Sequence, residues 1–416
     1  MLTSRLSLRL VRHARRSYRV LALESSCDDS CVALLEKQTP AGRPIVVDHY
    51  KSTLSSAAAG GIIPTAAQVF HNYTIGGLVD KMATTYNFDQ NPPDLICVTK
   101  GPGMAGSLTA SIQLAKGLAL AWKVPLVGVH HMLGHLLTPQ LDVDVKYPFL
   151  SLLCSGGHTM LVYSKSVGHH EVIINTMDIA VGDSLDKCAR EIGFYGNQLA
   201  REMEKYIRNN PWPAETTATV TEPPIDLALG LPMKGPKYLR FPDKIEFTFA
   251  SFLSRVQTTL KRHPDAIDEK QRQYMAHHIQ NMAFDHIIDR INVALMIHGT
   301  NKKLCPTADG KFDGVIDIVC SGGVAANKSL RHKLSHNLKF RETLGHEPTF
   351  HFPPLDLCTD NAIMIGLAGI GQFEKLRIMS DMSMVARPKW PINELMDESW
   401  VHVDDATYDK VTKYNS

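Results

Sequence analysis

The sequence lacks long hydrophobic runs and paired cysteines. No uninterrupted apolar stretch approaches the roughly 20 residues needed to cross a bilayer, so we expect a soluble protein that does not bind membranes. The eight cysteines are scattered without a CxxC spacing, which argues against a zinc ribbon and a disulfide framework. With 416 residues and 44% hydrophobic content, the chain is long enough for two lobes of an α/β protein.

The first 19 residues contain no acidic side chain. They hold six arginines, five of which recur at steps of three and four residues, at positions 5, 9, 12, 16 and 19. An Arg-rich, acid-free amphipathic segment is typical of a mitochondrial transit peptide, so we predict a leader over 1–19 and a mitochondrial matrix location. A disordered basic tail is the alternative. Without these arginines the net charge falls from +2 to −4, because 38 basic residues then face 42 acidic ones. Nucleic-acid binding would therefore need local basic patches.

A pair of histidines follows the apolar strand expected at 125–127. If a helix begins at His131, then His131 and His135 lie one turn apart on one face, where two imidazoles can share a metal ion. About one such pair is expected by chance among 19 histidines. A second pair, His332 and His336, lies in a basic run and is typical of a solvated helix face. The first pair follows a buried strand, where functional residues usually lie, and is the candidate metal site.

Two aspartates are placed next to predicted elements in a way that suits chemistry. Asp28 lies in a polar turn between the strands expected at 20–24 and 31–35, although Asp and Ser also favour ordinary turns. Asp360 precedes a helix expected at 362–371 and would ordinarily be only a cap. It is also the oxygen ligand that a two-histidine site would need.

A glycine loop follows the strand expected at 94–99. Gly101, Gly103 and Gly106 match the GxGxxG pattern of dinucleotide-binding loops. We reject that function because the next strand ends in two histidines instead of a ribose-binding acid. The remaining expectation is a loop whose backbone N–H groups, with Ser107 as a helix cap, could face an anion.

The second half of the chain repeats the strand-and-glycine pattern. Gly156 and Gly157 join the strands expected at 148–154 and 160–164, where glycines let a ligand approach the backbone, although a plain hairpin is equally consistent. Asp186, on a helix expected at 184–192, is by itself a surface charge. Asn327 follows a strand and a glycine pair, where its amide could bind a base or ribose.

Residues 208–245 are rich in Pro, Thr and Lys, which predicts an irregular insertion. A long amphipathic helix is expected at 269–298. The insertion holds a candidate basic patch beside aromatic residues 247–249. Its members are Lys234, Lys237, Arg240 and Lys244.

Taken together, these motifs resemble those of the Kae/TsaD/Qri family of tRNA threonylcarbamoyl transferases. The resemblance covers residues 20 to about 395, and the leader is similar to that of the mitochondrial branch. It rests on residues 24–29, 60–64, 101–103, 130–135, 155–159, 320–327 and 358–361. It implies a two-lobed actin-like ATPase fold, the ASKHA fold built from a duplicated ribonuclease H-like unit. The first lobe would span 20–148 and be completed by about 370–400, and the second would span 149–369.

The resemblance also implies an activity. The family transfers the threonylcarbamoyl group from threonylcarbamoyl-AMP to N6 of adenosine 37 in tRNAs that read ANN codons, releasing AMP. A separate synthase would supply threonylcarbamoyl-AMP, and we expect a homodimer. By the same resemblance His131, His135 and Asp360 would bind one divalent metal ion per subunit, Fe or Zn, and Asp28 would take the proton of the adenosine amine. The substrate-binding residues would be Leu153, Cys154, Ser155, Gly156, Gly157, Asp186, Gly196 and Asn327.

The sequence departs from the family pattern at two places, and its residues also bear on three alternative activities. Residues 193–198 replace the family's Pro-Gly-Gly, which affects the role of Gly196, and Leu133 replaces a bacterial Glu. A metallopeptidase would need a glutamate base between the histidines, which Met132 and Leu133 cannot supply. An actin-fold kinase or ATPase is the main alternative, but such enzymes bind Mg²⁺ through phosphates and water instead of two histidines. A non-catalytic binding module is less consistent with a complete ligand set.

Overall fold

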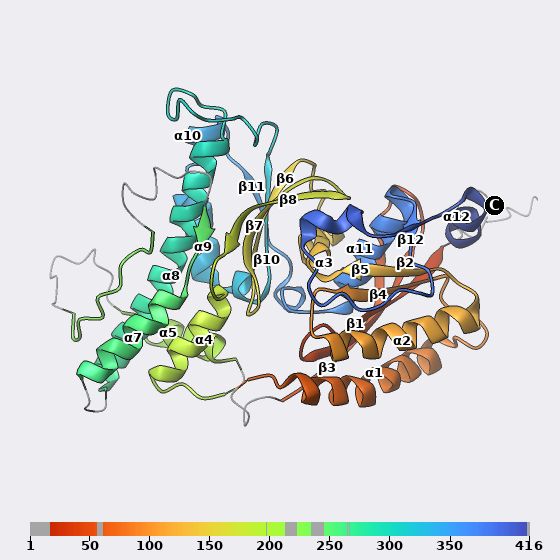
Figure 1. Cartoon of the computed structure of the whole chain (residues 1–416), viewed down its shortest axis with the longest axis horizontal. Coiled ribbons are helices and arrows are strands. Elements are labelled where there is room, and N and C mark those ends of the chain that lie inside the picture. The colour runs from red at the N-terminus through yellow and green to blue at the C-terminus, as the bar shows by residue number, and fades with distance from the viewer. Residues whose placement is uncertain are drawn as a thin grey trace, which may run out of the picture.

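The computed structural model describes residues 17–55, 61–196, 198–212, 223–233, 245–263, 265 and 267–413. The predicted leader up to residue 16 and the basic residues of the insertion, Lys234 to Lys244, lie outside the described residues. None of the described helices is both long and apolar enough to span a membrane. The chain forms two α/β halves that lie side by side, with the C-terminal segment on the first half (Figure 1).

The first half is built on a five-stranded sheet with the order β3-β2-β1-β4-β5. Strands β1 to β3 are antiparallel, and β4 and β5 run parallel to β1. Alternate residues of β1, β2, β4 and β5 enter different hydrophobic clusters, as strands with both faces buried require. Helices α1 and α2 cover one face and α11 covers the other. The bounds are β1 Tyr18–Glu24, β2 Asp29–Lys37, β3 Ile45–Thr53, α1 Pro64–Tyr86, β4 Leu95–Gly101, α2 Ala105–Trp122, β5 Leu126–His130 and α11 Ala362–Lys375.

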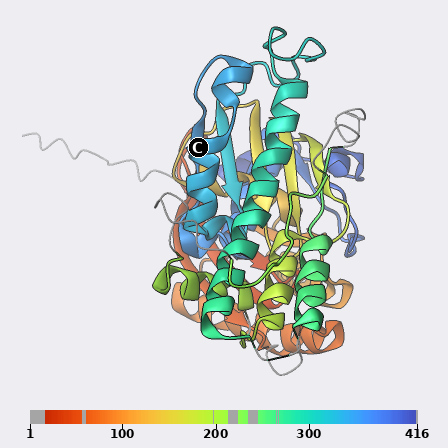
Figure 2. The same ribbon diagram turned by 90° about the vertical axis from the view of Figure 1, so that its left-hand side faces the viewer.

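The second half is built on a six-stranded sheet with the order β11-β10-β6-β7-β8-β9. Helix α8 crosses the sheet in front of its strands (Figure 2). Its observed start follows from a capping box between Asp268 and Gln271, and its bounds agree with the prediction. The strands are β6 Phe149–Cys154, β7 Thr159–Ser166, β8 His169–Thr176, β9 Glu246–Phe247, β10 Asp317–Ser321 and β11 Thr349–His351. The helices are α4 Val181–Glu191, α5 Leu199–Asn209, α7 Ala250–Arg262, α8 Glu269–His298, α9 Lys328–Asn337 and α10 Phe340–Leu344.

The two sheets repeat one topology. In the first, an antiparallel β1-β2-β3 meander is extended by β4 and β5, which are parallel to β1. In the second, an antiparallel β6-β7-β8 meander is extended by β10 and β11, which are parallel to β6. The turns after β1 and β6 are therefore equivalent in the two halves.

Helix α11 returns the chain from the second half to the first. It packs on the first sheet through glycines: a Cβ at Gly366 would lie 2.5 Å from Leu35, and one at Gly369 2.3 Å from the Cys97 sulfur. The return therefore starts at Ala362, somewhat before the expected residue 370. The remaining elements are α3 His131–Leu137, β12 Ile378–Met379, β13 Val401–His402, α12 Asp405–Thr412 and the 3-10 helices η2 Thr138–Leu141, η3 Gly323–Ala326, η4 Leu355–Leu357 and η5 Ile392–Asp397.

Two expectations were wrong. Arg19 does not belong to a leader helix: it lies in β1 opposite Glu36, and its backbone N–H donates to Asp94. In the glycine loop after β4, the N–H groups of Gly103 and Met104 donate to the carbonyls of Pro388 and Ser26 and are therefore not available to an anion. Likewise, Ser107 does not cap α2, which already begins at Ala105.

Candidate metal centre

Helix α3 starts directly after strand β5, and His130 fixes its start. The ring Nδ1 of His130 accepts a hydrogen bond from the Met132 N–H at 3.1 Å, while Nε2 donates to the carbonyl of Trp390 at 2.7 Å. Burial lowers the pKa of His130 well below its usual value, in keeping with this neutral state. His130 is therefore a structural residue that orients the two histidines following it.

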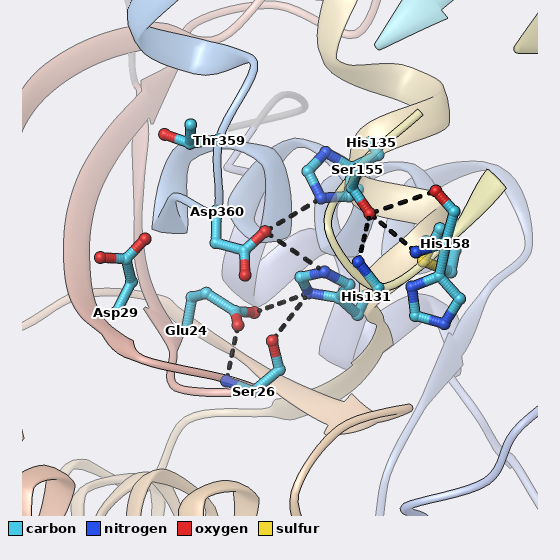
Figure 3. A network of polar contacts seen from close by, with 12 residues as sticks. Glu24, Ser26, Asp29, His131, His135, Ser155, His158, Thr359 and Asp360 are labelled. Atoms are coloured by element: carbon cyan, nitrogen blue, oxygen red, sulfur yellow. Dashed lines mark hydrogen bonds and ion pairs between the residues drawn. The ribbon is translucent and has the colours of Figure 1, made fainter. Parts of the chain in front are cut away.

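The three predicted metal ligands converge in space (Figure 3). His131 and His135 lie on one face of α3, with ring centroids 4.9 Å apart. The Nε2 atoms of His131 and His135 lie 3.5 Å and 3.2 Å from Oδ1 of Asp360. One ligand atom from each residue lies within 4.8 Å of the others. The i,i+4 spacing produced the expected pair, and the fold brings in an aspartate 225 positions away.

Asp360 is held in place through its backbone neighbours. The side chain of Asn361 caps α11 by accepting from the Met364 N–H, and its amide donates to the carbonyl of Thr359. Lys51 on β3 donates to the carbonyl of Asp360 at 3.0 Å. The Asp360 carboxylate is thus presented to the histidines from a loop anchored on both sides.

The charges around His131 favour a cation. Glu24 is fully buried, and its Oε2 lies 3.3 Å from Nδ1 of His131. Burial alone would lower the pKa of His131, but the charges of Glu24 and Asp360 outweigh it and raise that pKa to about 10. Burial also opposes ionisation of Asp360, yet the charge of His131 and the hydrogen bonds from both histidines hold its pKa well below the usual value. Two carboxylates flanking two imidazoles form a site that attracts positive charge.

The residues present fit a divalent metal ion. Two imidazole nitrogens and one carboxylate oxygen are the donor set that Fe and Zn accept, and a carboxylate behind a histidine ligand is the usual support. The Nδ1 atom of His135 is buried and has no hydrogen-bond partner among the described residues. Helix α3 carries no carboxylate, and Leu133 is fully buried in the core, so the base of a zincin-type peptidase is missing.

The turn after β6 presents glycines to the space beside this centre. Its Ser155 hydroxyl accepts from the His158 N–H at 3.0 Å, while a Cβ at Gly156 or Gly157 would meet nothing within 4 Å. Behind the turn, a Cβ at Gly322 would lie 2.4 Å from the carbonyl oxygen of Cys154, and one at Gly182 2.7 Å from that of Ser155. The outer side of this turn is therefore open and its inner side is tightly packed.

Leu153 and Cys154 precede this turn with buried side chains. Only their backbone atoms are available to a ligand.

Three residues near the centre were not predicted as site residues: Glu24, Ser26 and His158. Ser26 Oγ lies 3.1 Å from Nδ1 of His131. Burial, followed by the charges of His131 and His135, lowers the pKa of His158 to about 4, so the glycine turn adjoins the metal centre. All three lie within the sequence motifs, but no spacing rule connects them to α3.

Other predicted site residues are already engaged in the fold. Oδ1 of Asp186 accepts from the Ala200 N–H at 2.5 Å and thereby joins α4 to α5. Oδ1 of Asn327 caps α9 by accepting from the Ser329 N–H, and its amide donates to Gln280 at 2.9 Å. Both side chains therefore have partners within the protein.

Gly196, Asp28 and the second histidine pair are not members of the cluster of His131, His135 and Asp360. Gly196 is exposed, with φ of +135°. Asp28 is half-buried beside Cys27, whose pKa is raised by burial and then by the charges of Asp360 and Asp28. His332 and His336 are exposed on α9, as predicted.

Comparison with known proteins gives a consistent result. Residues 46–367 match the family model described as TsaD, tRNA N6-adenosine threonylcarbamoyltransferase. The chain is 34% identical over 402 residues to the mitochondrial tRNA N6-adenosine threonylcarbamoyltransferase of Schizosaccharomyces pombe, covering 93% of this chain and 90% of that protein. It is 32% identical over 361 residues to the Bacillus subtilis enzyme of the same name, covering 86% and 91%.

Solved structures are more distant. HypF from T. kodakarensis matches with a TM-score of 0.46 and 14% identity, covering 86% of this chain and 48% of that one. A hexokinase matches with a TM-score of 0.39 and 11% identity, covering 87% and 85%.

Proposed function

Because the chain belongs to the TsaD family of tRNA N6-adenosine threonylcarbamoyltransferases, we propose that it forms N6-threonylcarbamoyladenosine at position 37 of ANN-decoding tRNAs. The donor is threonylcarbamoyl-AMP, made by a separate synthase. N6 of adenosine attacks the carbamoyl carbon, the bond from that carbon to the AMP phosphate oxygen breaks, and AMP leaves. The observation that carries this proposal is the convergence of His131, His135 and Asp360 beside an open glycine turn.

The two halves are the lobes of an actin-like fold in this proposal. The first comprises 20–148 together with the C-terminal segment, and the second is the sheet-and-helix unit between them. The repeated strand order of the two sheets supports a duplicated ribonuclease H-like unit. Ligands of such folds bind between the lobes, near the turns that follow the first strand of each.

His131, His135 and Asp360 would hold one Fe or Zn ion. When bound, that ion supplies Lewis acidity and neutralises negative charge on the donor. The protein's own residues hold the ligands: Ser26 contacts His131, and the loop carrying Asp360 is held by Asn361 and Lys51.

The glycine turn is the proposed adenylate site. The exposed backbone of Ser155, Gly156 and Gly157 can approach a phosphate closely because no side chain intervenes. Leu153 and Cys154 contribute backbone atoms only, and Asp186, Gly196 and Asn327 shape the surrounding loops. Asp28 is the proposed base that accepts the N6 proton during the attack, since N6 of adenosine is a weak nucleophile.

We assign the protein to the mitochondrial matrix and expect a homodimer. The relative from Schizosaccharomyces pombe is named a mitochondrial enzyme, which supports the location. Exposed apolar side chains on α1 support self-association: Val69 and Tyr73 are 53% and 83% exposed, and Gly76 and Gly77 on the same helix have no side chain. Sedimentation of the full chain should give a dimer, and Tyr73→Lys should shift it toward monomer. A monomer for the unaltered chain would contradict this part of the proposal.

The transfer is tested with the full chain, unmodified ANN-decoding tRNA and purified threonylcarbamoyl-AMP. After digestion of the tRNA, mass spectrometry should detect the modified nucleoside. His131→Ala and Asp360→Ala should give none. Folded, metal-loaded protein that makes no product but phosphorylates a small molecule with ATP would favour the kinase alternative.

A further inference from the structure

Glu24 lies behind the metal centre and was not among its predicted residues. It ends strand β1, it is fully buried, and both of its carboxylate oxygens have partners. Oε1 accepts from the Ser26 N–H at 2.7 Å, and Oε2 accepts from the Thr99 hydroxyl on β4. The carboxylate is thereby held by the turn after β1 and by the neighbouring strand β4.

The same Oε2 faces Nδ1 of His131 at 3.3 Å. An ionised carboxylate can only accept hydrogen bonds, so Nδ1 must carry the proton of this contact. In a neutral imidazole the lone pair then lies on Nε2, which points toward Asp360 and His135 (Figure 3). Ser26 Oγ, at 3.1 Å from Nδ1, holds the ring from a second direction.

His135 has no comparable support. Its Nε2 faces the same Asp360 oxygen at 3.2 Å, but its Nδ1 is buried without a hydrogen-bond partner among the described residues. The two histidines therefore differ: the ring of His131 has polar contacts at both nitrogens, whereas the ring of His135 has one only at Nε2 among the described residues.

We propose that Glu24 is a positioning residue of the metal centre, which locks His131 in the Nδ1–H form and directs its Nε2 to the metal. This inference rests on the metal-binding role proposed above. His131 is then the fixed ligand and His135 the adaptable one. Loss of a carboxylate behind a histidine ligand typically lowers metal affinity roughly 10- to 100-fold.

The test is Glu24→Gln in the full chain, with Zn²⁺ affinity measured by competition with a chromophoric chelator. Gln is nearly isosteric but does not carry the charge. We expect affinity to fall roughly 10- to 100-fold and the absorption spectrum of the Co²⁺-loaded protein to change. Both are readouts of the ligand geometry and do not depend on transferase activity.

Asp317→Asn is the matched control. Asp317 is also a buried carboxylate on a strand, it accepts from the Lys146 N–H at 2.9 Å, and its Oδ1 lies 2.8 Å from the His351 ring. It lies at the start of β10 and contacts no proposed ligand, so Zn²⁺ affinity should be unchanged. An equal loss in both variants would mean general destabilisation and would overturn the proposal.

The remaining outcomes are also decisive. Wild-type affinity and Co²⁺ spectrum in Glu24→Gln, with binding abolished in His131→Ala, would refute the role of Glu24 and leave the metal centre standing. Absence of Zn²⁺ binding by the unaltered chain would refute both the role of Glu24 and the metal centre itself. If Glu24→Gln does not fold, Thr99→Val is the second variant, because it removes the hydroxyl that holds Oε2 of Glu24. It should weaken Zn²⁺ binding several-fold. Unchanged Zn²⁺ affinity in Thr99→Val would count against the proposal.

Discussion

The turns after β1 and β6 are equivalent in the two sheets, yet they differ in chemistry. The turn after β1 follows a buried carboxylate, and its Ser26 contacts a histidine of the metal centre. The turn after β6 contains two exposed glycines with no side chain to exclude a ligand. The comparison teaches that one supersecondary unit can contact a proposed metal ligand in one copy and expose glycine backbone in the other.

The largest expected effect concerns His131, the histidine that the turn after β1 contacts. His131→Ala removes a proposed metal ligand, so we expect loss of stoichiometric metal and a fall in transfer rate of about 1,000-fold or more. Metal content by mass spectrometry and the tRNA assay measure this. His332→Ala is the matched control, because it also belongs to an i,i+4 pair but is exposed on α9. Equal losses in the two variants would argue against the assigned centre.

Gly322→Ala tests the packed side of the turn after β6. Gly322 has φ of +97° and ψ of 161°, a region that is essentially restricted to glycine, and its Cβ would meet the Cys154 carbonyl at 2.4 Å. We expect destabilisation of about 3 kcal/mol in denaturant unfolding. Gly310→Ala, with φ of +74° and open space, should cost only about 1 kcal/mol. Similar costs at both positions would show that the close approach is unimportant.

Gly157→Ala tests the open side of the same turn. No atom lies within 4 Å of the added Cβ, so the free energy of unfolding should change by less than about 0.5 kcal/mol. The methyl group does project from the exposed turn, and we expect KM for threonylcarbamoyl-AMP to rise about tenfold with metal affinity unchanged. Unaltered KM would place the donor elsewhere.

The smallest effects should separate the two turns most clearly. Ser26→Ala removes a contact to His131 and should weaken metal binding a few-fold, about 1 kcal/mol, while leaving KM unchanged. Ser155→Ala removes the acceptor of the Gly157 and His158 N–H groups and should raise KM by a similar factor with metal affinity unchanged. Chelator competition and steady-state kinetics on both variants decide this. If the two variants behave alike, the turns do not have separate roles.

Local patterns predicted much of the fold. The helix at 269–298 has both ends where its amphipathic pattern predicted them, and the His131–His135 pair lies on one helical face as its spacing required. Strands of the parallel core were recognisable because buried strands are continuous apolar runs. The position of Arg19 could not be predicted from the arginine spacing, because its place in β1 depends on pairing with β2, which a local spacing does not encode.

The sequence by itself determined the family, the strand and helix pattern, and the pair of histidines, since all of these depend on motifs or on spacing within one element. Only the tertiary structure decided which residues meet. It brought Asp360 and Glu24, 225 and 107 positions from His135 and His131, to the two sides of these rings, and it engaged Asp186 and Asn327 in helix capping. The physical reason is that contacts between distant elements depend on sheet order and packing, which no local periodicity encodes.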